Sequence, residues 1–305
     1  MGKEFDVVGL GYTAFDFLAV VPYLPEENTK LEIESLTLQG GGPAATACVT
    51  LARLGLKTAF IGKVGDDYFG RSMIEGLVDE GVDVSSLVVE SGKSSQTAFI
   101  MINGSNASRT ILWTRGSVSR LEPGEVNMDL VSSAKGLLID DLECEAALEA
   151  ARRAAEEQTI VVLDAGSRRP GVDELLRYSD YIVASERFAA DTADSVEDAL
   201  KKLFSYGSKA SVVTLGERGC AAFDGDVMIN VPGFHVEAVD TTGAGDVFHG
   251  AFLFGVLKGW ELEKICIFAN AVAALKCTSV GGRSAIPDYR TAVDFIKTRR
   301  NGIDL

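Results

Sequence analysis

The sequence contains one run of residues that could bind an anion and activate a neighbouring group. Gly243, Ala244 and Gly245 come directly before Asp246, and an apolar stretch typical of a helix follows. The first N–H groups of a helix are unpaired and lie at its positive end, and small side chains leave them uncovered. We therefore predict an anion site at these three amides, with Asp246 beside it as a general base. A tight turn followed by an ordinary helix-start carboxylate is the alternative.

Strand and helix patterns alternate along most of the chain, and these elements must position the anion site. Several apolar runs are continuous, as in strands that are covered on both faces. This alternation is typical of a mostly parallel sheet between two layers of helices, a three-layer α/β/α sandwich. The expected strands are 5–9, 58–61, 136–140, 159–164, 181–184 and 211–215, and the expected helices are 43–54, 69–80, 144–157, 196–206, 246–258 and 263–277.

Two segments interrupt the alternation. Residues 15–38 contain no convincing helix after the first strand, and residues 96–114 have the pattern of a hairpin with Asn103-Gly104 at its turn. We predict that segments 12–38 and 95–115 form a small β-sheet that covers one end of the main sheet as a lid. Two unrelated surface hairpins are the alternative. With this lid, residues 1–305 are expected to form a single domain.

Composition excludes several classes of function. The chain has 305 residues, 47% of them hydrophobic, with 29 Lys and Arg against 44 Asp and Glu, a net charge of −15. Such a chain is expected to fold, and its acidity argues against nucleic acid and anionic membranes as partners. Five cysteines without a Cys-x-x-Cys pair, beside two histidines, make a zinc site improbable and favour reduced thiols in the cytoplasm. No apolar stretch approaches the ~20 residues that cross a bilayer, so we expect a soluble protein.

Five motifs, in order, resemble those of the ribokinase-like, or pfkB, carbohydrate kinases, and the resemblance covers nearly the whole chain. Some stretches, such as Lys93-Ser94-Ser95-Gln96 and Ala274-Leu275-Lys276-Cys277-Thr278, are most similar to sulfofructose-kinase-like members. Residues 9–16 resemble the first strand of the family with its sugar-binding Asp, and residues 40–47 with 53–55 resemble its first signature. Residues 213–219 resemble the nucleotide loop, and residues 239–251 resemble the second signature. Residues 268–271, with 281–282 and Pro287, resemble the helix on the adenine side and the closing loop.

The resemblance implies phosphoryl transfer from ATP to a hydroxymethyl group of a sugar, with Asp246 as the base. The sugar would contact Asp16, Gly41, Gly42 and Thr46, although most members have Asn at position 46, and Leu142 stands where the ribokinase branch has an acidic residue. These departures leave open whether the sugar is neutral or anionic, although the subgroup favours a ketose. The lid cations Lys30, Arg109 and Arg115 would meet an anionic substituent, unless they are only solvated.

The resemblance also implies a set of cofactor contacts. ATP would be bound by Thr214, Gly216, Gly219 and Asn270. The Mg²⁺ motif Asn-x-x-Glu is absent, because the matching stretch is Ser185-Glu186-Arg187-Phe188, which leaves Glu186 as the nearby acid. A homodimer through the lid is also expected. The family has a site for a monovalent cation, which we expect to hold K⁺. The matching positions are Asp240 and Thr242, with the carbonyls of Lys276, Ser279 and Gly281.

Other functions compete with this interpretation. The stretch Gly9-Leu10-Gly11-Tyr12-Thr13-Ala14 follows a strand, as a dinucleotide-binding fingerprint would, but residues 15–21 are apolar and β-prone where that fold needs a helix. A nucleoside kinase of the same fold, or a sugar sensor without catalysis, would share most of the motifs. The intact run through Asp246 favours an enzyme over a sensor.

Overall fold

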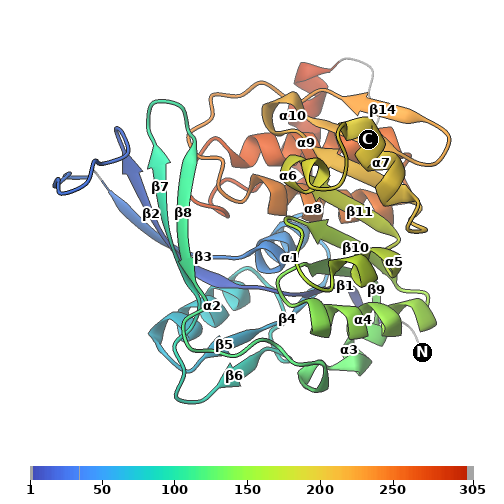
Figure 1. The fold of residues 1–305 in the computed structure, drawn as a ribbon, viewed down its shortest axis with the longest axis horizontal. Coiled ribbons are helices and arrows are strands. Elements are labelled where there is room, and N and C mark those ends of the chain that lie inside the picture. Colours follow the sequence, from blue (N-terminus) through green and yellow to red (C-terminus); the bar gives the residue numbers. More distant parts are fainter. Residues whose placement is uncertain (1–2, 34, 301–305) are drawn as a thin grey trace.

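A long, mostly parallel sheet forms the centre of the molecule in the computed structural model, which describes residues 3–33 and 35–300 (Figure 1). Within these residues the sheet has eight strands. The six strands from β12 to β4 are parallel, and β13 and β14 extend the edge as an antiparallel hairpin. In spatial order they are β14 (Met228–Val231), β13 (Cys220–Phe223), β12 (Ala210–Thr214), β11 (Tyr181–Ser185), β10 (Ile160–Ala165), β9 (Ala134–Asp140), β1 (Phe5–Leu10) and β4 (Thr58–Ile61).

Helices cover both faces of this sheet. Alternate residues of one strand, such as Val161 and Val162 of β10, belong to two separate apolar cores, which explains why the strands are continuously apolar. The predicted sandwich is confirmed. One face carries α1 (Pro43–Arg53), α8 (Ala244–Leu257), α9 (Leu262–Lys276) and α10 (Tyr289–Arg299), and the other carries α3 (Met128–Ser132), α4 (Cys144–Glu156), α5 (Val172–Arg177), α6 (Glu186–Ala190) and α7 (Val196–Phe204).

A second sheet of four strands stands beside the main sheet (Figure 1). Its order is β3 (Leu36–Gly41), β2 (Ala14–Val21), β7 (Thr97–Asn103) and β8 (Arg109–Thr114), and β2 pairs with β7 in parallel. We call it the small sheet. The helix α2 (Tyr68–Asp79) packs against β2 and β3, and a two-stranded sheet joins β5 (Lys63–Gly65) to β6 (Val88–Glu90).

The two faces of the small sheet differ because side chains alternate along each strand. Register places Asp16, Gln39, Ala98 and Trp113 on one face, and Trp113 there contacts Tyr12 at the end of the first strand. This is the inner face. The outer face carries a row of apolar side chains, Leu38, Phe17, Phe99 and Leu112.

Some local predictions need correction. The hairpin between β7 and β8 exists, but its turn is longer than an Asn-Gly pair, because Asn103 N–H bonds to the Ser108 carbonyl and the left-handed residue is Ala107 (φ 55°). The edge hairpin β13–β14 and the helix α10 were not foreseen. After Gly9 and Gly11 the chain enters β2 and no helix, so the dinucleotide-binding alternative is wrong.

Two further observations concern the composition. None of the described helices is long and apolar enough to cross a membrane. The five cysteines are all unpaired, and four of them are buried, as expected for small core residues.

Candidate active site

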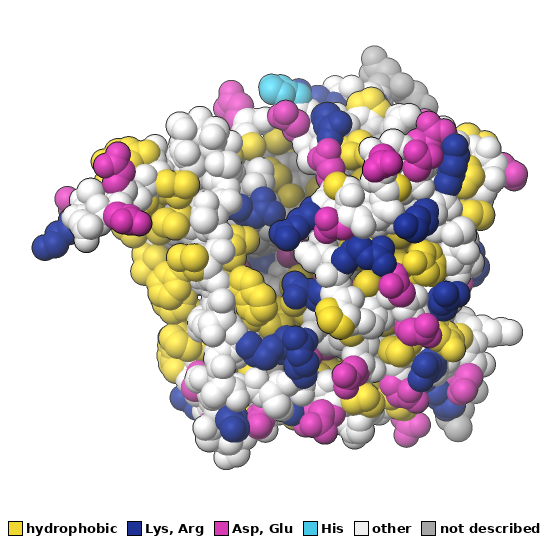
Figure 2. Space-filling model, viewed as in Figure 1, with side chains coloured by type: hydrophobic (Ala, Val, Ile, Leu, Met, Phe, Trp, Pro, Cys, Tyr) yellow, Lys and Arg dark blue, Asp and Glu magenta, His cyan; other side chains and the backbone are white. Residues whose placement is uncertain are grey.

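The candidate site lies where the carboxyl ends of the parallel strands meet the start of α8 and the inner face of the small sheet. Figure 2 shows a hollow between the small sheet and the body of the molecule, with Lys and Arg side chains around it. In open α/β sheets ligands bind at this edge of the strands. The acidic residues that end β9 and β10, including Asp140 and Asp164, lie here as well.

The start of α8 has the geometry of an anion site. Gly243 caps the helix with φ 75°, and a Cβ there would lie 2.9 Å from Gly282 Cα, so only glycine fits. The Ala244 N–H donates to the Thr241 carbonyl over a long 3.3 Å. Within the described residues, the N–H groups of Gly243 and Gly245 donate no hydrogen bond. Two of the three predicted amides are therefore free to receive an anion.

Asp246 lies half-buried in the first turn of this helix. Burial raises the pKa of its carboxyl above the ordinary value, and the positive charges of Arg109, Lys276 and Arg283 act against that rise. A carboxylate with a raised pKa beside free amides is a suitable general base for a hydroxyl bound at this point.

Behind Asp246 lies a buried pair, Asp164 and His249, to which sequence reasoning assigned no role. His249 Nδ1 is 2.6 Å from the Gly245 carbonyl and 3.3 Å from Asp164 Oδ2, and Nε2 is 3.1 Å from the Val183 carbonyl. Burial raises the pKa of Asp164 well above its ordinary value and lowers the pKa of His249. Both shifts favour the uncharged forms of the two groups, because burial penalises either charge. In the sequence, the signals for this pair are that Asp164 stands near the end of a predicted strand and that His249 follows Gly245 by one helical turn.

Asp16 lies on the inner face of the small sheet, and its carboxylate has no hydrogen-bond partner in the described residues. The residue is 6% exposed. Burial raises its pKa to about 7. A Cβ on Gly41 would lie 2.0 Å from Asp16 Oδ2, so glycine is needed for this approach. Gly42 has φ 92° and packs on the backbone of Thr13.

Arg283 is a further site residue, and it was missed. Its guanidinium is buried and donates to the Gly41 carbonyl at 3.0 Å and to Thr46 Oγ1 at 3.3 Å. Burial lowers its pKa to about 10, although Asp16 and Asp246 favour its charge. The hydroxyl oxygen of Thr46 thus accepts a hydrogen bond from Arg283. The signal available in the sequence was an arginine directly after Gly281-Gly282.

The cations predicted for the lid have different surroundings. Arg115 pairs with the buried Glu143 at 2.5 Å and lies over the Tyr12 ring. Arg109 donates to Thr241 Oγ1 at 2.8 Å and so joins the small sheet to the loop before α8. Lys30 is exposed in the connection from β2 to β3, which extends away from the main sheet (Figure 1), and makes no hydrogen bond or ion pair within residues 3–33 and 35–300. Arg109 is therefore the predicted lid cation that contacts the loop before α8.

The predicted nucleotide-binding residues fall in two places. Thr214 ends β12, and Gly216 and Gly219 follow it with φ 61° and 90°. Asn270 lies on α9, where its buried amide donates to the Val231 carbonyl at 3.2 Å and the Pro232 carbonyl at 3.5 Å. That amide ties α9 to β14.

The acidic residues fit a Mg²⁺ ion that is bound mainly by phosphates. The Glu186 carboxylate is exposed and pairs with the Arg218 guanidinium. In the described part of the chain, no three His, Cys, Asp or Glu side chains form a metal cage. Mg²⁺ that binds with a nucleotide needs few protein ligands. The neighbouring charges of Asp246, Asp141 and Asp140 add to the raised pKa of Asp164, and a divalent cation would relieve this repulsion.

A buried lysine competes with a monovalent cation at the positions predicted for K⁺. Lys276 is fully buried, and its Nζ donates to the main-chain carbonyl of Asp240 at 2.7 Å. The Asp240 carboxylate accepts the N–H groups of Thr242 and Gly281, both at 2.8 Å. A cation added beside this ammonium would be repelled, since two like unit charges about 4 Å apart repel by ~4 kcal/mol at an effective dielectric constant of ~20. Thr242 Oγ1 is buried without a hydrogen-bond partner in the described residues.

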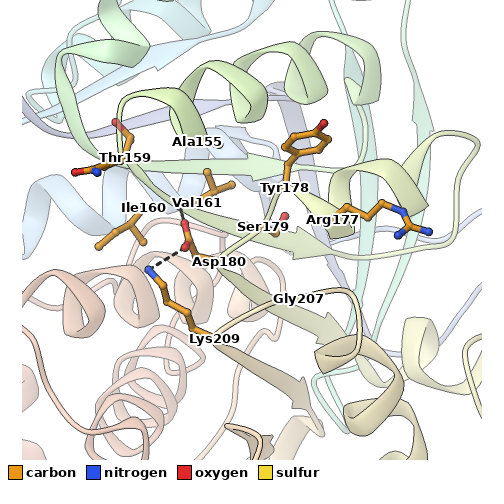
Figure 3. A pocket seen from close by; sticks show the side chains of 11 residues that line it. Ala155, Thr159, Ile160, Val161, Arg177, Tyr178, Ser179, Asp180, Gly207 and Lys209 are labelled. Atoms are coloured by element: carbon orange, nitrogen blue, oxygen red, sulfur yellow. Dashed lines mark hydrogen bonds and ion pairs between the residues drawn. The ribbon is translucent and has the colours of Figure 1, made fainter.

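A separate cavity lies at the opposite edge of the sheet. It has a volume of about 460 Å³ and is lined by residues such as Ile160, Tyr178 and Gly207 (Figure 3). Asp180 and Lys209 form an ion pair of 2.9 Å across it. It lies at the amino ends of β10, β11 and β12, away from Asp246 and the strand ends described above.

Comparison with known proteins identifies the family of this chain. The family model described as pfkB family carbohydrate kinase matches residues 4–289. The chain belongs to this family. A 5-dehydro-2-deoxygluconokinase of Clostridium perfringens is 30% identical over an alignment of 325 residues, which covers 98% of this chain and 94% of that protein. Fructokinase-2 of Oryza sativa is 31% identical over 290 residues, 86% of each chain.

A solved structure extends the comparison to ligands. Arabidopsis thaliana ribokinase, complexed with ribose and ATP, superposes with a TM-score of 0.82 at 25% identity, over 97% of this chain and 99% of that one. The pfkB assignment confirms the predicted class of enzyme, a carbohydrate kinase that transfers a phosphoryl group. The narrower resemblance to sulfofructose kinases stays a prediction.

Proposed function

We propose that this kinase transfers the γ-phosphoryl group of ATP to a hydroxymethyl group of a ketose-like sugar. The observation that carries the proposal is the half-buried Asp246 beside the free amides of Gly243 and Gly245. Asp246 takes the proton of the attacking hydroxyl, and the oxygen then attacks the γ-phosphorus as the bond to ADP breaks. The two amides stabilise the charge on the transferred oxygens.

Asp16 and its neighbours supply the sugar site in this proposal. An ionised carboxylate accepts hydrogen bonds from two hydroxyls, which a sugar offers on adjacent carbons. Gly41 permits close approach of the ring, and Trp113, in edge contact with Tyr12, offers an apolar wall. Arg283 holds the backbone of Gly41 in place.

Mg²⁺ bound with ATP would neutralise part of the phosphate charge, and Asp164 is the carboxylate that we expect to face it. ATP itself would contact the loop of Gly216 and Gly219 after β12. For Asn270 the resemblance implies ATP binding, whereas the geometry indicates a structural role, because its amide donates to the carbonyls of Val231 and Pro232.

The surroundings of the lid cations favour an acceptor recognised mainly through hydroxyl groups. Arg115 is neutralised by Glu143, and Lys30 is exposed in an extended connection. Support for an anionic substituent on the sugar therefore rests on Arg109. A panel of matched neutral ketoses and sugar acids measures this directly, through the ratio of their kcat/KM values.

The outer face of the small sheet supports the predicted homodimer. Phe99 and Leu112 are 55% and 61% exposed, and they lie in one row with Phe17 and Leu38. An exposed apolar row of this kind is a contact surface for another protein, and a second copy of the chain carries the same row. Sedimentation of the protein and of Leu112→Glu tests this, and a wild-type monomer would contradict it.

The experiment that tests the function is ADP release from ATP and Mg²⁺ over a panel of sugars and nucleosides, with Asp246→Asn as the matched variant. A positioned general base contributes about 10²- to 10⁴-fold, so we expect a loss of that size with ATP affinity and thermal unfolding unchanged. Near-normal turnover of Asp246→Asn would refute the role of this residue. Sugar binding without sugar-dependent ADP release would instead indicate a sensor.

A further inference from the structure

Lys276 is a fully buried lysine at the end of α9, directly under the loop that leads into the anion site. Buried lysines are rare, because an ammonium group loses its hydration when it leaves water. Within the described residues, the hydrogen bond of Lys276 Nζ goes to the main-chain carbonyl of Asp240, at 2.7 Å.

Asp240 carries the opposite charge near Lys276, and it is also fully buried. Its carboxylate oxygens accept the N–H groups of Thr242 and Gly281, so its charge organises two loops at once. The N–H groups of Val239 and Asp240 donate to the Cys277 carbonyl at 2.8 and 3.2 Å. Lys276 and Cys277 together therefore fasten the segment before α8 to the end of α9.

This fastening reaches the anion site through a short stretch of chain. Three residues after Asp240 comes Gly243, whose Cα packs against Gly282 so closely that no Cβ fits. The amides that we expect to hold the phosphoryl group begin at Gly243. Their direction therefore depends on where Asp240 and the loop of Gly281 and Gly282 are held.

We propose that the Lys276 ammonium is a built-in cation that positions the anion site, so that this kinase works without added K⁺. The family implies a monovalent cation at this place, and here a side chain supplies the charge. Lys276 is a positioning residue, since it acts on the reaction through Asp240 and Gly243. The activity measurements below rest on the proposed function, and the unfolding measurements do not.

The first test compares K⁺ with tetramethylammonium, a cation too large to enter the site, at equal ionic strength. We expect kcat/KM of the wild type to differ by less than about twofold between the two salts, and its thermal unfolding to show no shift specific to K⁺. A wild-type enzyme that is activated about tenfold or more by K⁺, or stabilised by K⁺ alone, would overturn the proposal.

The second test removes the ammonium. Lys276→Ala leaves a space beside the Asp240 carbonyl, and we expect a loss of about 10²-fold in kcat in tetramethylammonium salts, as for other small displacements of reacting groups. Addition of K⁺, NH₄⁺ or methylammonium should restore part of this loss and raise the unfolding temperature of the unliganded variant. Lys276→Met fills the space without a charge and should be rescued by none of these cations.

Lys63 provides a matched control. It is a buried lysine of β5 that pairs with Glu125 at 2.7 Å and does not contact the loop before α8. Lys63→Ala should lower stability without any specific response to K⁺ or methylammonium. Equal responses of the two alanine variants, or a Lys276→Ala variant that is as active as the wild type in tetramethylammonium, would refute the role of Lys276. If neither alanine variant folds, the salt comparison on the wild type still decides.

Discussion

Replacing Asp16 by asparagine tests whether the sugar site is built around a buried carboxylate that lacks a protein partner. Burial raises the pKa of Asp16 to about 7, against an ordinary value of 3.8 for the unfolded chain. Below the lower value the carboxyl is protonated in both states. As the pH rises through the interval, the unfolded chain releases its proton while the folded chain retains it, so the folded state loses stability. About three pH units at 1.36 kcal/mol each amount to ~4 kcal/mol.

Asp16→Asn removes this pH-dependent cost. We expect the free energy of unfolding of the variant, relative to the wild type, to increase by ~2–3 kcal/mol between about pH 5 and about pH 8. A buried amide carries a desolvation cost of its own, which does not change with pH and cancels from this difference. Urea unfolding of the unliganded proteins at the two pH values measures it. The same variant should lose sugar-dependent ADP release, because an asparagine amide is uncharged and has an NH₂ donor in place of the second acceptor oxygen.

An exposed aspartate serves as the control. Asp79 ends α2 at the surface, so Asp79→Asn is the matched exposed substitution for the same two measurements. A stability difference for Asp16→Asn that is the same at both pH values, or that becomes unfavourable at the higher pH, would refute the reasoning.

Three further substitutions test other parts of the site. Gly41→Ala would place a Cβ 2.0 Å from the Asp16 carboxylate, so we expect kcat/KM for the sugar to fall by about 10²-fold or more while the affinity for ATP is retained. The control is Gly76→Ala, whose Cβ would meet no atom within 4 Å, and it should leave kcat/KM unchanged. Arg109→Gln removes a charge that lowers the pKa of Asp246, so the acidic limb of the kcat profile should move to higher pH, and an unmoved limb would contradict the contact. Asn270→Ala should lower the free energy of unfolding by about 1–3 kcal/mol through two unpaired carbonyls, and weaker ATP binding at unchanged stability would instead support the nucleotide role.

Much of the fold was predictable because its signals are local. Continuous apolar runs marked the buried strands, and Pro43 and the run at 243–246 marked the starts of α1 and α8 within one or two residues. The edge hairpin β13–β14 was missed because its strands are short and lack a clear pattern. The turn before β8 was misjudged because Asn103-Gly104 is a strong two-residue turn signal, yet Ala107 adopts the left-handed conformation there.

The candidate site was predictable only in part. Asp246, Asp16 and the glycines stood in recognisable motifs, whereas Arg283 and Asp164 acquire their roles through contacts with distant segments. Arg283 reaches Gly41 across 242 positions of sequence, and no local pattern reports such a contact. Arg115 was expected from the sequence to be available to the substrate, but the fold pairs it with Glu143, which neutralises its charge.

By itself, the sequence determined the alternation of strands and helices over most of the chain and the small residues at the start of α8 with a carboxylate next to them. These features depend on residues that are neighbours in the chain. Only the tertiary structure decided which charges share the site. Lys276 and Asp240 lie 36 positions apart, and their pairing exists because α9 packs beside α8. Burial then sets the strength of such contacts, since a charge removed from water interacts mainly with the few groups that the fold places around it.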